Sequence, residues 1–142
     1  MLNTITLTGG THGNETSGIQ LIRDWLKFGL PSRFSALNVD CSLANTAAIA
    51  ANVRFLDEDL NRQFTTERLA GDNPAREAVL AKELNQKFGP KGNTRTDFFI
   101  DIHNTTSNMG QCLILSGEKP FEDELTRQLC AHLTRDPLVR VY

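Results

Sequence analysis

Residues 8–15, Thr-Gly-Gly-Thr-His-Gly-Asn-Glu, most restrict how this chain can fold. They follow a short apolar strand pattern at residues 3–8 and precede an amphipathic helix pattern at residues 16–28. A strand that turns through glycines directly into a helix is typical of an α/β domain. The same turn carries the imidazole of His12 and the carboxylate of Glu15, three residues apart, so fold and chemistry start at one place.

Strand and helix patterns alternate along the rest of the chain. Further strands are predicted at residues 36–43, 96–103, 112–115 and 138–142, and helices at residues 74–88 and 120–133. Residues 46–51 are predicted to form a short helical turn, and residues 53–56 a short strand or an extended segment. The nearly continuous apolar run at 96–103 is typical of a central strand covered on both faces. The alternation predicts one α/β domain with a mixed, largely parallel central sheet flanked by helices. No helix follows the last predicted strand, which indicates a truncated domain.

The apolar positions of two predicted helices define the faces that they should bury. Ile19, Ile22 and Leu26 share one face of the first helix, and Gly29 and Pro31 stop it. The helix at 74–88 presents an apolar face as well, formed by Leu80, Leu84 and Phe88. Asp72-Asn73-Pro74 is a favourable start for that helix, because proline suits the first helical position and the residues before it cap free N–H groups.

Composition excludes several classes of protein. The chain has 142 residues, 39% of them hydrophobic and 23% charged, as expected for one globular domain. No apolar run approaches the ~18 residues that a membrane helix needs, and residues 1–4 lack the features of a signal peptide. Cys41, Cys112 and Cys130 are widely spaced, which predicts a reducing, cytoplasmic location. The net charge of −2 and dispersed basic residues predict no nucleic-acid partner.

Two histidines follow predicted strands and point to a metal site. The carboxyl ends of parallel strands meet at one edge of a sheet, where sites in α/β domains form. Zinc binds imidazole nitrogen and carboxylate oxygen, and catalytic sites keep three protein ligands. His12, Glu15 and His103 would supply that set, with His12 and Glu15 on one face where the helix begins. Asp101 shares a strand face with His103 and could orient its imidazole or bind substrate.

Each part has a plainer interpretation when taken alone. A single H-x-x-E pattern is weak, His103 could be a core histidine, and Glu15 could be a first-turn carboxylate favoured by the helix dipole. The glycines of residues 9–13 could form a phosphate-binding loop, although they match neither the P-loop nor the G-x-G-x-x-G pattern. His132 lies beside the apolar face of the last predicted helix and is interpreted as structural.

Two polar segments could complete a site. The first carries Arg54, Asp59, Asn61 and Arg62, and arginine offers a planar fork suited to carboxylates. The same arginines could instead pair with the acidic residues 57–59 as solvated surface charges. The second is the polar run 104–110, which could turn the chain or line a polar pocket.

Three motifs, taken in order, closely resemble the aspartoacylase branch of the aspartoacylase/succinylglutamate desuccinylase family, a relative of the zinc carboxypeptidases. The motifs are Gly-Gly-Thr-His-Gly-Asn-Glu at 9–15, Asp-Leu-Asn-Arg at 59–62 and Asp-Ile-His-Asn-Thr-Thr-Ser-Asn-Met-Gly at 101–110. The resemblance includes residues 87–91 and continues to residues 141–142, so it covers essentially the whole chain. It implies a zinc-carboxypeptidase-like fold.

The resemblance also implies an activity. The expected reaction is zinc-dependent hydrolysis of the amide of an N-acyl amino acid, such as N-acetyl-L-aspartate, to a carboxylate and a free amino acid. N-succinylglutamate and N-acyl aromatic amino acids are the alternative substrates, and the run 105–110 favours the aspartoacylase side. His12, Glu15 and His103 match the family's zinc ligands.

Five further residues match family roles in substrate binding and catalysis. Arg54 matches the arginine that polarises the scissile carbonyl and stabilises its oxyanion. Asn61 and Arg62 match the pair that holds the substrate's α-carboxylate, and Asp59 matches a residue that orients this pair. Asn104 matches a residue of the pocket wall beside the zinc histidine.

The chain departs from the family pattern in several places. The family's general-base glutamate, its arginine for the substrate side chain and its C-terminal β-rich domain all correspond to segments beyond Tyr142. Glu118 is a weak replacement for the base, and Asn45-Thr46 stands where the family has Asn-Pro. Residues 1–142 are therefore expected to be the N-terminal part of a zinc hydrolase catalytic domain. A metal-binding fragment without turnover is the competing hypothesis, and exposed strand edges could favour a homo-oligomer.

Overall fold

The computed structural model describes residues 4–30, 35–36, 38–90, 92–105, 111–114, 124–133 and 139–141. These residues belong to two compact units, Met1–Asn104 and Thr105–Tyr142. The first unit contains every residue that the sequence assigns to the metal site and to the binding of substrate.

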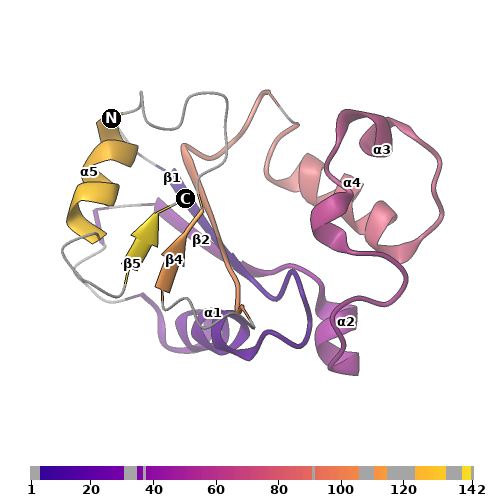
Figure 1. Cartoon of the computed structure of the whole chain (residues 1–142), viewed down its shortest axis with the longest axis horizontal. Helices are drawn as coiled ribbons and strands as arrows, with labels where there is room; N and C mark the ends of the chain where they lie inside the picture. The colour runs from indigo at the N-terminus through magenta and orange to yellow at the C-terminus, as the bar shows by residue number, and fades with distance from the viewer. Residues whose placement is uncertain are drawn as a thin grey trace. The chain divides into compact units, whose positions relative to one another are not determined.

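The first unit is built on a sheet of three parallel strands in the order β2-β1-β3 (Figure 1). They are β1 (Thr4–Gly9), β2 (Asn38–Leu43) and β3 (Phe98–Ile102). The sequence predicted the parallel α/β arrangement correctly, but β1 rather than β3 is the central strand among the described residues. Phe99 of β3 is 46% exposed and packs edge-on against Phe88, so the apolar run of β3 does not reflect burial on both faces.

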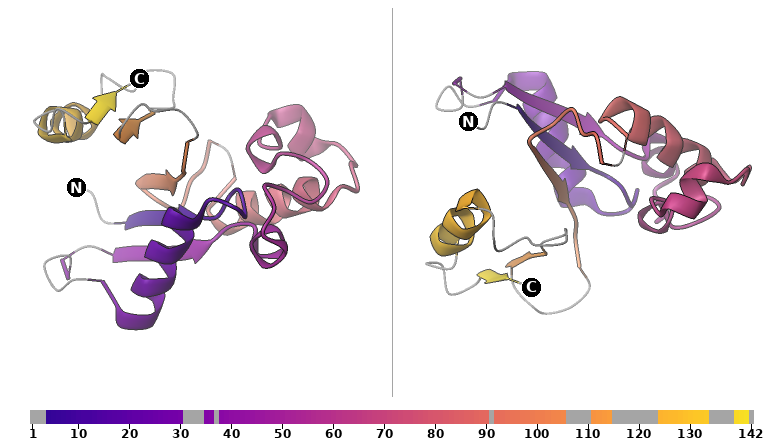
Figure 2. Two further views of the ribbon diagram at one scale, coloured as in Figure 1. Left: turned by 60° about the horizontal axis from the view of Figure 1, so that its bottom comes forward. Right: turned by 90° about the horizontal axis from the view of Figure 1, so that it is seen from above.

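Helix α1 (Thr16–Phe28) connects β1 to β2 and lies along one face of the sheet (Figure 2). It has the bounds that the sequence predicted, and it buries Ile19 and Ile22. Leu26 was expected on the same buried face but is 58% exposed. The described residues therefore leave the last turn of α1 uncovered, which a periodicity argument cannot reveal.

Two glycines allow α1 to approach the sheet closely. A Cβ atom on Gly18 would lie 2.5 Å from the carbonyl oxygen of Ile102, and one on Gly9 would lie 2.6 Å from the backbone of Gly18. Neither distance leaves room for a methyl group. The missing side chains therefore bring the first turn of α1, directly after Glu15, against the ends of β1 and β3.

We expect Gly18→Ala to destabilise the fold by about 1–3 kcal/mol, the usual cost of overpacking. Alanine ordinarily stabilises a helix by about 1 kcal/mol relative to glycine. A loss of stability in Gly18→Ala would therefore indicate the steric conflict with Ile102. The measurement is the midpoint of urea unfolding. Gln20→Ala, at an exposed position of the same helix, is the control and should change the midpoint little. An unchanged or higher midpoint for Gly18→Ala would contradict the close approach.

Three helices follow β2 and gather at one side of the sheet (Figures 1 and 2). They are α2 (Thr46–Ala51), α3 (Thr66–Ala70) and α4 (Arg76–Lys87), and a 3-10 turn, η2 (Leu60–Arg62), lies among them. A small apolar cluster holds this region together, formed by Ala44, Leu60 and Ala81 with Phe64, Leu69, Leu80 and Leu84 packed against it. Fully buried Leu60 thus anchors the turn that carries Asn61 and Arg62.

The structure refines two expectations in this region. Of the two alternatives predicted for 53–56, a short strand and an extended segment, the strand is excluded, because these residues have no strand partner among the described residues. The helix expected from Pro74 begins at Arg76, and Asn73 instead caps the preceding turn by accepting a hydrogen bond from the N–H of Ala75 at 3.0 Å. Helix α3 was not predicted.

The second unit contains β4 (Gln111–Leu113) and β5 (Val139–Val141), paired in parallel, and helix α5 (Glu124–Leu133). A strand, a helix and a strand were predicted here, and β4, α5 and β5 overlap the predicted ranges. Residues 106–110, Glu118, Pro120 and Tyr142 lie outside the described residues. Cys41, Cys112 and Cys130 form no disulfide bonds. Within the described ranges, every helix falls short of the length and hydrophobicity needed to cross a bilayer.

Candidate metal centre

The ends of two neighbouring strands bring the predicted metal ligands together. β1 and β3 are parallel, with Gly9 opposite Ile102, so the segments that follow these two strands leave the sheet at the same edge. His12 lies in the loop after β1, and His103 directly follows β3. His12 and His103, which are 91 positions apart in the sequence (103 − 12), therefore lie close together, as the strand pattern predicted.

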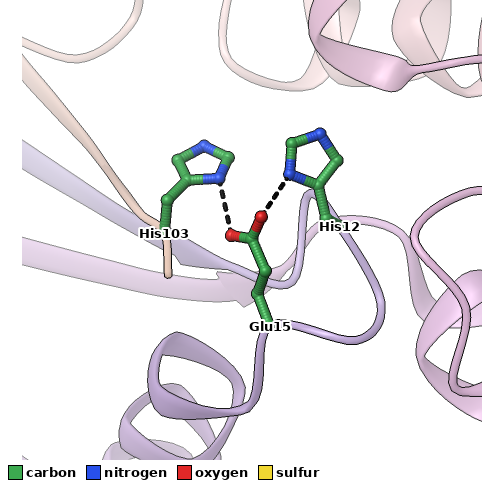
Figure 3. A group of neighbouring side chains, drawn as sticks. All are labelled: His12, Glu15 and His103. Atoms are coloured by element: carbon green, nitrogen blue, oxygen red, sulfur yellow. Dashed lines mark hydrogen bonds and ion pairs between the residues drawn. The ribbon is translucent and has the colours of Figure 1, made fainter. Parts of the chain in front are cut away.

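The carboxylate of Glu15 lies between the two imidazole rings (Figure 3). Its Oε1 is 2.6 Å from His12 Nδ1, and its Oε2 is 2.8 Å from His103 Nδ1. The ring centroids of the two histidines are 5.1 Å apart. One potential ligand atom from each of the three residues lies within 4.8 Å of the others, the one such group of histidine, cysteine and acidic side chains that the described residues contain.

His12 and Glu15 reach this point from a turn and not from a helix face. The N–H of Glu15 donates to the carbonyl of His12 at 3.2 Å, and α1 begins only at Thr16. The explanation that both residues share one helix face was therefore wrong, although their convergence was predicted. Gly13 holds the turn in place, because its N–H donates to the carbonyl of Arg54 at 3.1 Å and a Cβ atom there would lie 2.1 Å from Ala48.

On the side away from Glu15, the Nε2 atom of each histidine contacts a second carboxylate. His12 Nε2 lies 3.1 Å from Asp59 Oδ1, and His103 Nε2 lies 2.8 Å from Asp101 Oδ2. A carboxylate can accept a hydrogen bond from Nε2 of each ring, which would leave Nδ1 available to a metal ion. Nδ1 is then the nitrogen of each ring that faces Glu15, and carboxylate–histidine pairs of this kind orient ligands in metal sites.

Asp101 is fixed in turn by two threonine hydroxyl groups. Thr8 Oγ1 donates to Asp101 Oδ1 at 2.9 Å, and Thr11 Oγ1 donates to Oδ2 at 2.7 Å. Burial would raise the pKa of Asp101, but hydrogen bonds from His103, Thr11 and Thr8 hold it below the usual range. The sequence placed Asp101 beside His103 correctly but did not identify the threonines, since Thr8 faces Asp101 only once the register of β1 and β3 is known.

The charges of these groups depend on one another. The hydrogen bond to Asp101 is the main cause that raises the pKa of His103 to about 9, against the opposing effect of burial, with further help from Glu15. Burial would raise the pKa of Asp59, but hydrogen bonds from His12, the N–H of Asn61 and Arg54 lower it. The raised pKa of His103 shows that the carboxylates around the two histidines favour a positive charge at this place.

The chemistry of the donor set fits zinc. Two imidazoles and one carboxylate are ligands that zinc prefers, and three protein ligands leave one coordination position open, as in catalytic sites. His12 and Glu15 are almost fully buried, whereas His103 is more exposed. The N–H of Asn104 also donates to Glu15 Oε2 at 2.9 Å, which further fixes the carboxylate.

Arg54 reaches the centre from the loop after α2. Its Nη1 lies 3.5 Å from Glu15 Oε1 and its Nη2 lies 3.3 Å from Asp59 Oδ2. The surface-charge interpretation is thus correct in that Arg54 pairs with Asp59, but the pair lies beside the metal group and not on a remote surface. The Arg54 side chain is 51% exposed, so a ligand in solution can reach it.

Asn61 and Arg62 lie in the 3-10 turn η2 next to this pair. Asp59 caps the turn, with its Oδ1 accepting the N–H of Asn61 at 3.0 Å, and the side chains of Asn61 and Arg62 are exposed. Asp59 therefore contacts His12, Arg54 and the turn at once. The sequence suggested that Asp59 orients Asn61 and Arg62 or pairs with an arginine, and its contact with His12 was missed.

Asn104 connects the end of β3 to the start of α1. Its Oδ1 accepts the N–H of Ser17 at 3.1 Å, and its Nδ2 donates to Ser17 Oγ at 2.9 Å. Helix α1 receives no capping hydrogen bond from the side chain of Glu15, the residue at its N-cap. The cap thus comes from a distant segment, and it fixes Glu15 and His103 relative to each other.

We expect Asp59→Asn to weaken zinc binding about 10–100-fold, the usual cost of losing the group that orients a ligand imidazole. Asparagine has the same shape but lacks the negative charge that His12 and Arg54 contact. Competition with a chelating dye measures the dissociation constant. Asp72→Asn is the control at an exposed position and should bind zinc as the wild type does. Equal affinities in the two variants would exclude this role for Asp59.

Known proteins resemble the chain in sequence and in fold. It is 42% identical to the human N-acyl-aromatic-L-amino acid amidohydrolase (carboxylate-forming) over 137 residues, which are 93% of this chain and 42% of that protein. It is 40% identical to the aspartoacylase of Xenopus tropicalis over 129 residues, 88% of this chain and 40% of that protein. The crystal structure of murine aminoacylase 3 matches with a TM-score of 0.82 and 40% identity, covering 99% of this chain and 47% of that one.

The chain spans less than half the length of each of these relatives. Residues 1–136 match the family described as the succinylglutamate desuccinylase/aspartoacylase catalytic domain. That match includes the three motifs of the sequence and all the residues of the metal centre described above. The chain belongs to the succinylglutamate desuccinylase/aspartoacylase catalytic-domain family.

Proposed function

We propose that the protein is a zinc-dependent deacylase that hydrolyses the amide bond of N-acyl amino acids to a carboxylate and a free amino acid. The observation that carries this proposal is the convergence of His12, Glu15 and His103 beside the guanidinium of Arg54. His12, Glu15 and His103 would hold the zinc ion. Membership of the deacylase family supports the same activity.

Zinc, when bound, supplies a Lewis acid that polarises a carbonyl and lowers the pKa of a water molecule. The protein's own groups do the rest. Asp59 and Asp101 would accept hydrogen bonds from Nε2 of His12 and His103 when zinc is bound, and the Nδ1 atoms face the centre. Arg54 carries positive charge beside the centre and would stabilise negative charge that develops on the carbonyl oxygen of the substrate.

Asn61 and Arg62 are proposed to bind the α-carboxylate of the substrate. Arginine can hold a carboxylate with two parallel hydrogen bonds, and an amide group can donate beside it. Their exposed side chains and their position in η2, directly after Asp59, support this role. Asn104 is proposed to line the pocket beside His103.

The proposed substrate is N-acetyl-L-aspartate, with N-acyl aromatic amino acids as the second candidate. The aspartoacylase-like run 105–110 favours the first substrate, and 42% identity to the human N-acyl-aromatic-L-amino acid amidohydrolase favours the second. We further propose that residues 1–142 form the N-terminal part of the catalytic domain and that a later segment carries the general base. A cytoplasmic location and a homo-oligomeric state remain predictions.

The test is hydrolysis by the full-length protein after metal removal and reloading with zinc. N-acetyl-L-aspartate, N-acetyl-L-tyrosine and N-succinyl-L-glutamate are compared by release of the free amino acid. We expect zinc to restore activity and N-acetyl-L-aspartate to give the highest kcat/KM. His12→Ala should abolish the activity, because it removes a zinc ligand. Full activity in His12→Ala, or no hydrolysis of any of the three substrates, would contradict the proposed function.

A further inference from the structure

The most unusual side chain outside the metal centre is Glu77, in the first turn of α4. It is a carboxylate with only 1% of its surface exposed, and its oxygens accept four hydrogen bonds. Oε1 accepts the N–H of Leu56 at 2.7 Å and Nδ2 of Asn45 at 3.1 Å. Oε2 accepts the N–H groups of Asp57 at 3.0 Å and Glu58 at 3.1 Å. Three consecutive backbone N–H groups of one loop thus bind a single buried carboxylate.

Such a site suits a charged carboxylate and no other side chain of similar size. Burial would raise the pKa of Glu77, but the hydrogen bonds from Leu56, Glu58, Asn45 and Asp57 lower it to about 2. The group is therefore ionised at neutral pH. Each of its oxygens meets two donors, and only an ionised carboxylate offers acceptors on both atoms.

The loop that Glu77 holds carries the residues proposed to bind substrate. Arg54 lies two positions before Leu56, and Asp59 directly follows Glu58. The turn with Asn61 and Arg62 comes next. Residues 53–59 form no strand, so the loop lacks a sheet's hydrogen bonds to fix its path. The carboxylate of Glu77 accepts hydrogen bonds from this loop instead. Its described hydrogen bonds include none to His12, Glu15 or His103.

Asn45 extends the connection towards the sheet. Its N–H donates to the carbonyl of Gly10 at 3.0 Å, and its side-chain oxygen accepts the N–H of Ala48 at 3.1 Å. Gly10 belongs to the turn that carries His12. Glu77 is thus linked through Asn45 to one side of the centre and through residues 56–58 to the other.

We infer that Glu77 is a positioning residue for the α-carboxylate of the substrate, because its buried carboxylate fixes the loop 54–62 beside the metal centre. The inference rests on the proposed function for its catalytic consequence. Its structural part, the anchoring of residues 56–58, does not depend on which reaction the protein performs. Glu77 itself touches neither the substrate site nor the metal group.

The catalytic test compares two substrates in the full-length, zinc-loaded protein. One is the N-acyl amino acid that the wild type hydrolyses, and the other is its α-carboxamide, which lacks the α-carboxylate. Glu77→Gln keeps the size of the side chain but replaces one acceptor oxygen with an amide NH₂ group, which would face two hydrogen-bond donors. We expect the wild type's preference for the carboxylate, as a ratio of kcat/KM values, to fall at least ~10-fold, the equivalent of losing about 1.4 kcal/mol of selective binding, with zinc content unchanged.

The ratio separates positioning from simple loss of folded protein. Misfolding lowers both kcat/KM values by the same factor, so an unchanged ratio in Glu77→Gln would overturn the inference. Glu83→Gln makes the same chemical change at an exposed position of α4 and should keep the wild-type ratio. Glu77→Asp retains the charge but withdraws the oxygens, and its ratio should also fall. If Glu77→Gln yields no folded protein, Glu77→Asp replaces it in the test. A wild-type ratio in Glu77→Asp would then overturn the inference.

Hydrogen exchange tests the anchoring without any activity. In Glu77→Gln we expect the amides of Leu56, Asp57 and Glu58 to exchange at least ~10-fold faster, while the amide of buried Ile22 in α1 keeps its wild-type rate. Wild-type exchange at residues 56–58 would overturn the inference. If the wild type hydrolyses neither substrate, the proposed function fails, and exchange alone still decides whether Glu77 holds the loop.

Discussion

His103→Ala should reduce bound zinc from about one ion per chain to none and abolish hydrolysis. His103 supplies one of the three donor atoms that lie within 4.8 Å of one another, and its loss leaves only the histidine and glutamate of the turn after β1. Two protein ligands are fewer than catalytic zinc sites use. The effect should exceed the ~100-fold loss expected from removing a group that only supports a ligand. Elemental analysis after metal stripping and reloading measures the zinc.

His132→Ala is the matched control for this experiment. His132, which was interpreted as a structural residue beside the apolar face of this helix, is exposed in α5, and its removal should leave zinc content unchanged. Circular dichroism should show that both variants are folded. One zinc per folded His103→Ala chain would mean that His103 is not a ligand.

Arg54→Ala should lower kcat by about 10²–10³-fold, the usual cost of losing a group that stabilises an oxyanion. The side chain lies beside Glu15 and Asp59 and is half exposed, so it can meet a substrate carbonyl at the centre. Zinc content should stay near that of the wild type at saturating zinc, because Arg54 contributes no ligand. Steady-state kinetics with the best of the three substrates, together with elemental analysis, measures both quantities.

Two further measurements make the role of Arg54 specific. Guanidinium added at millimolar concentration should restore part of the activity of Arg54→Ala, because the vacated position opens to solvent. Arg23→Ala, at an exposed position of α1, should have wild-type kinetics and no response to guanidinium. A higher KM with an unchanged kcat in Arg54→Ala would assign Arg54 to ground-state binding and refute its action on the oxyanion.

Much of the fold follows from local sequence patterns. The 3.6-residue periodicity and Gly29 predicted α1 with the bounds that it has, and the short apolar runs predicted β1, β2 and β3 to within two residues at the ends that could be compared. Such patterns are reliable because they depend on neighbours in the chain. They did not decide between a strand and an extended segment at residues 53–56, where the N–H of Leu56 bonds to the distant carboxylate of Glu77 and no strand forms.

The sequence by itself determined which residues could form the metal centre, because parallel strands must end at one edge and His12, Glu15 and His103 follow two such ends. Only the tertiary structure decided how these residues are held. Asp59 reaches His12 across 47 positions, and Asn45 and Glu77 meet across 32. It also decided that β1 is central and that Leu26 is exposed. Hydrogen bonds and burial of this kind depend on where distant segments pack, and local periodicity carries no information about that packing.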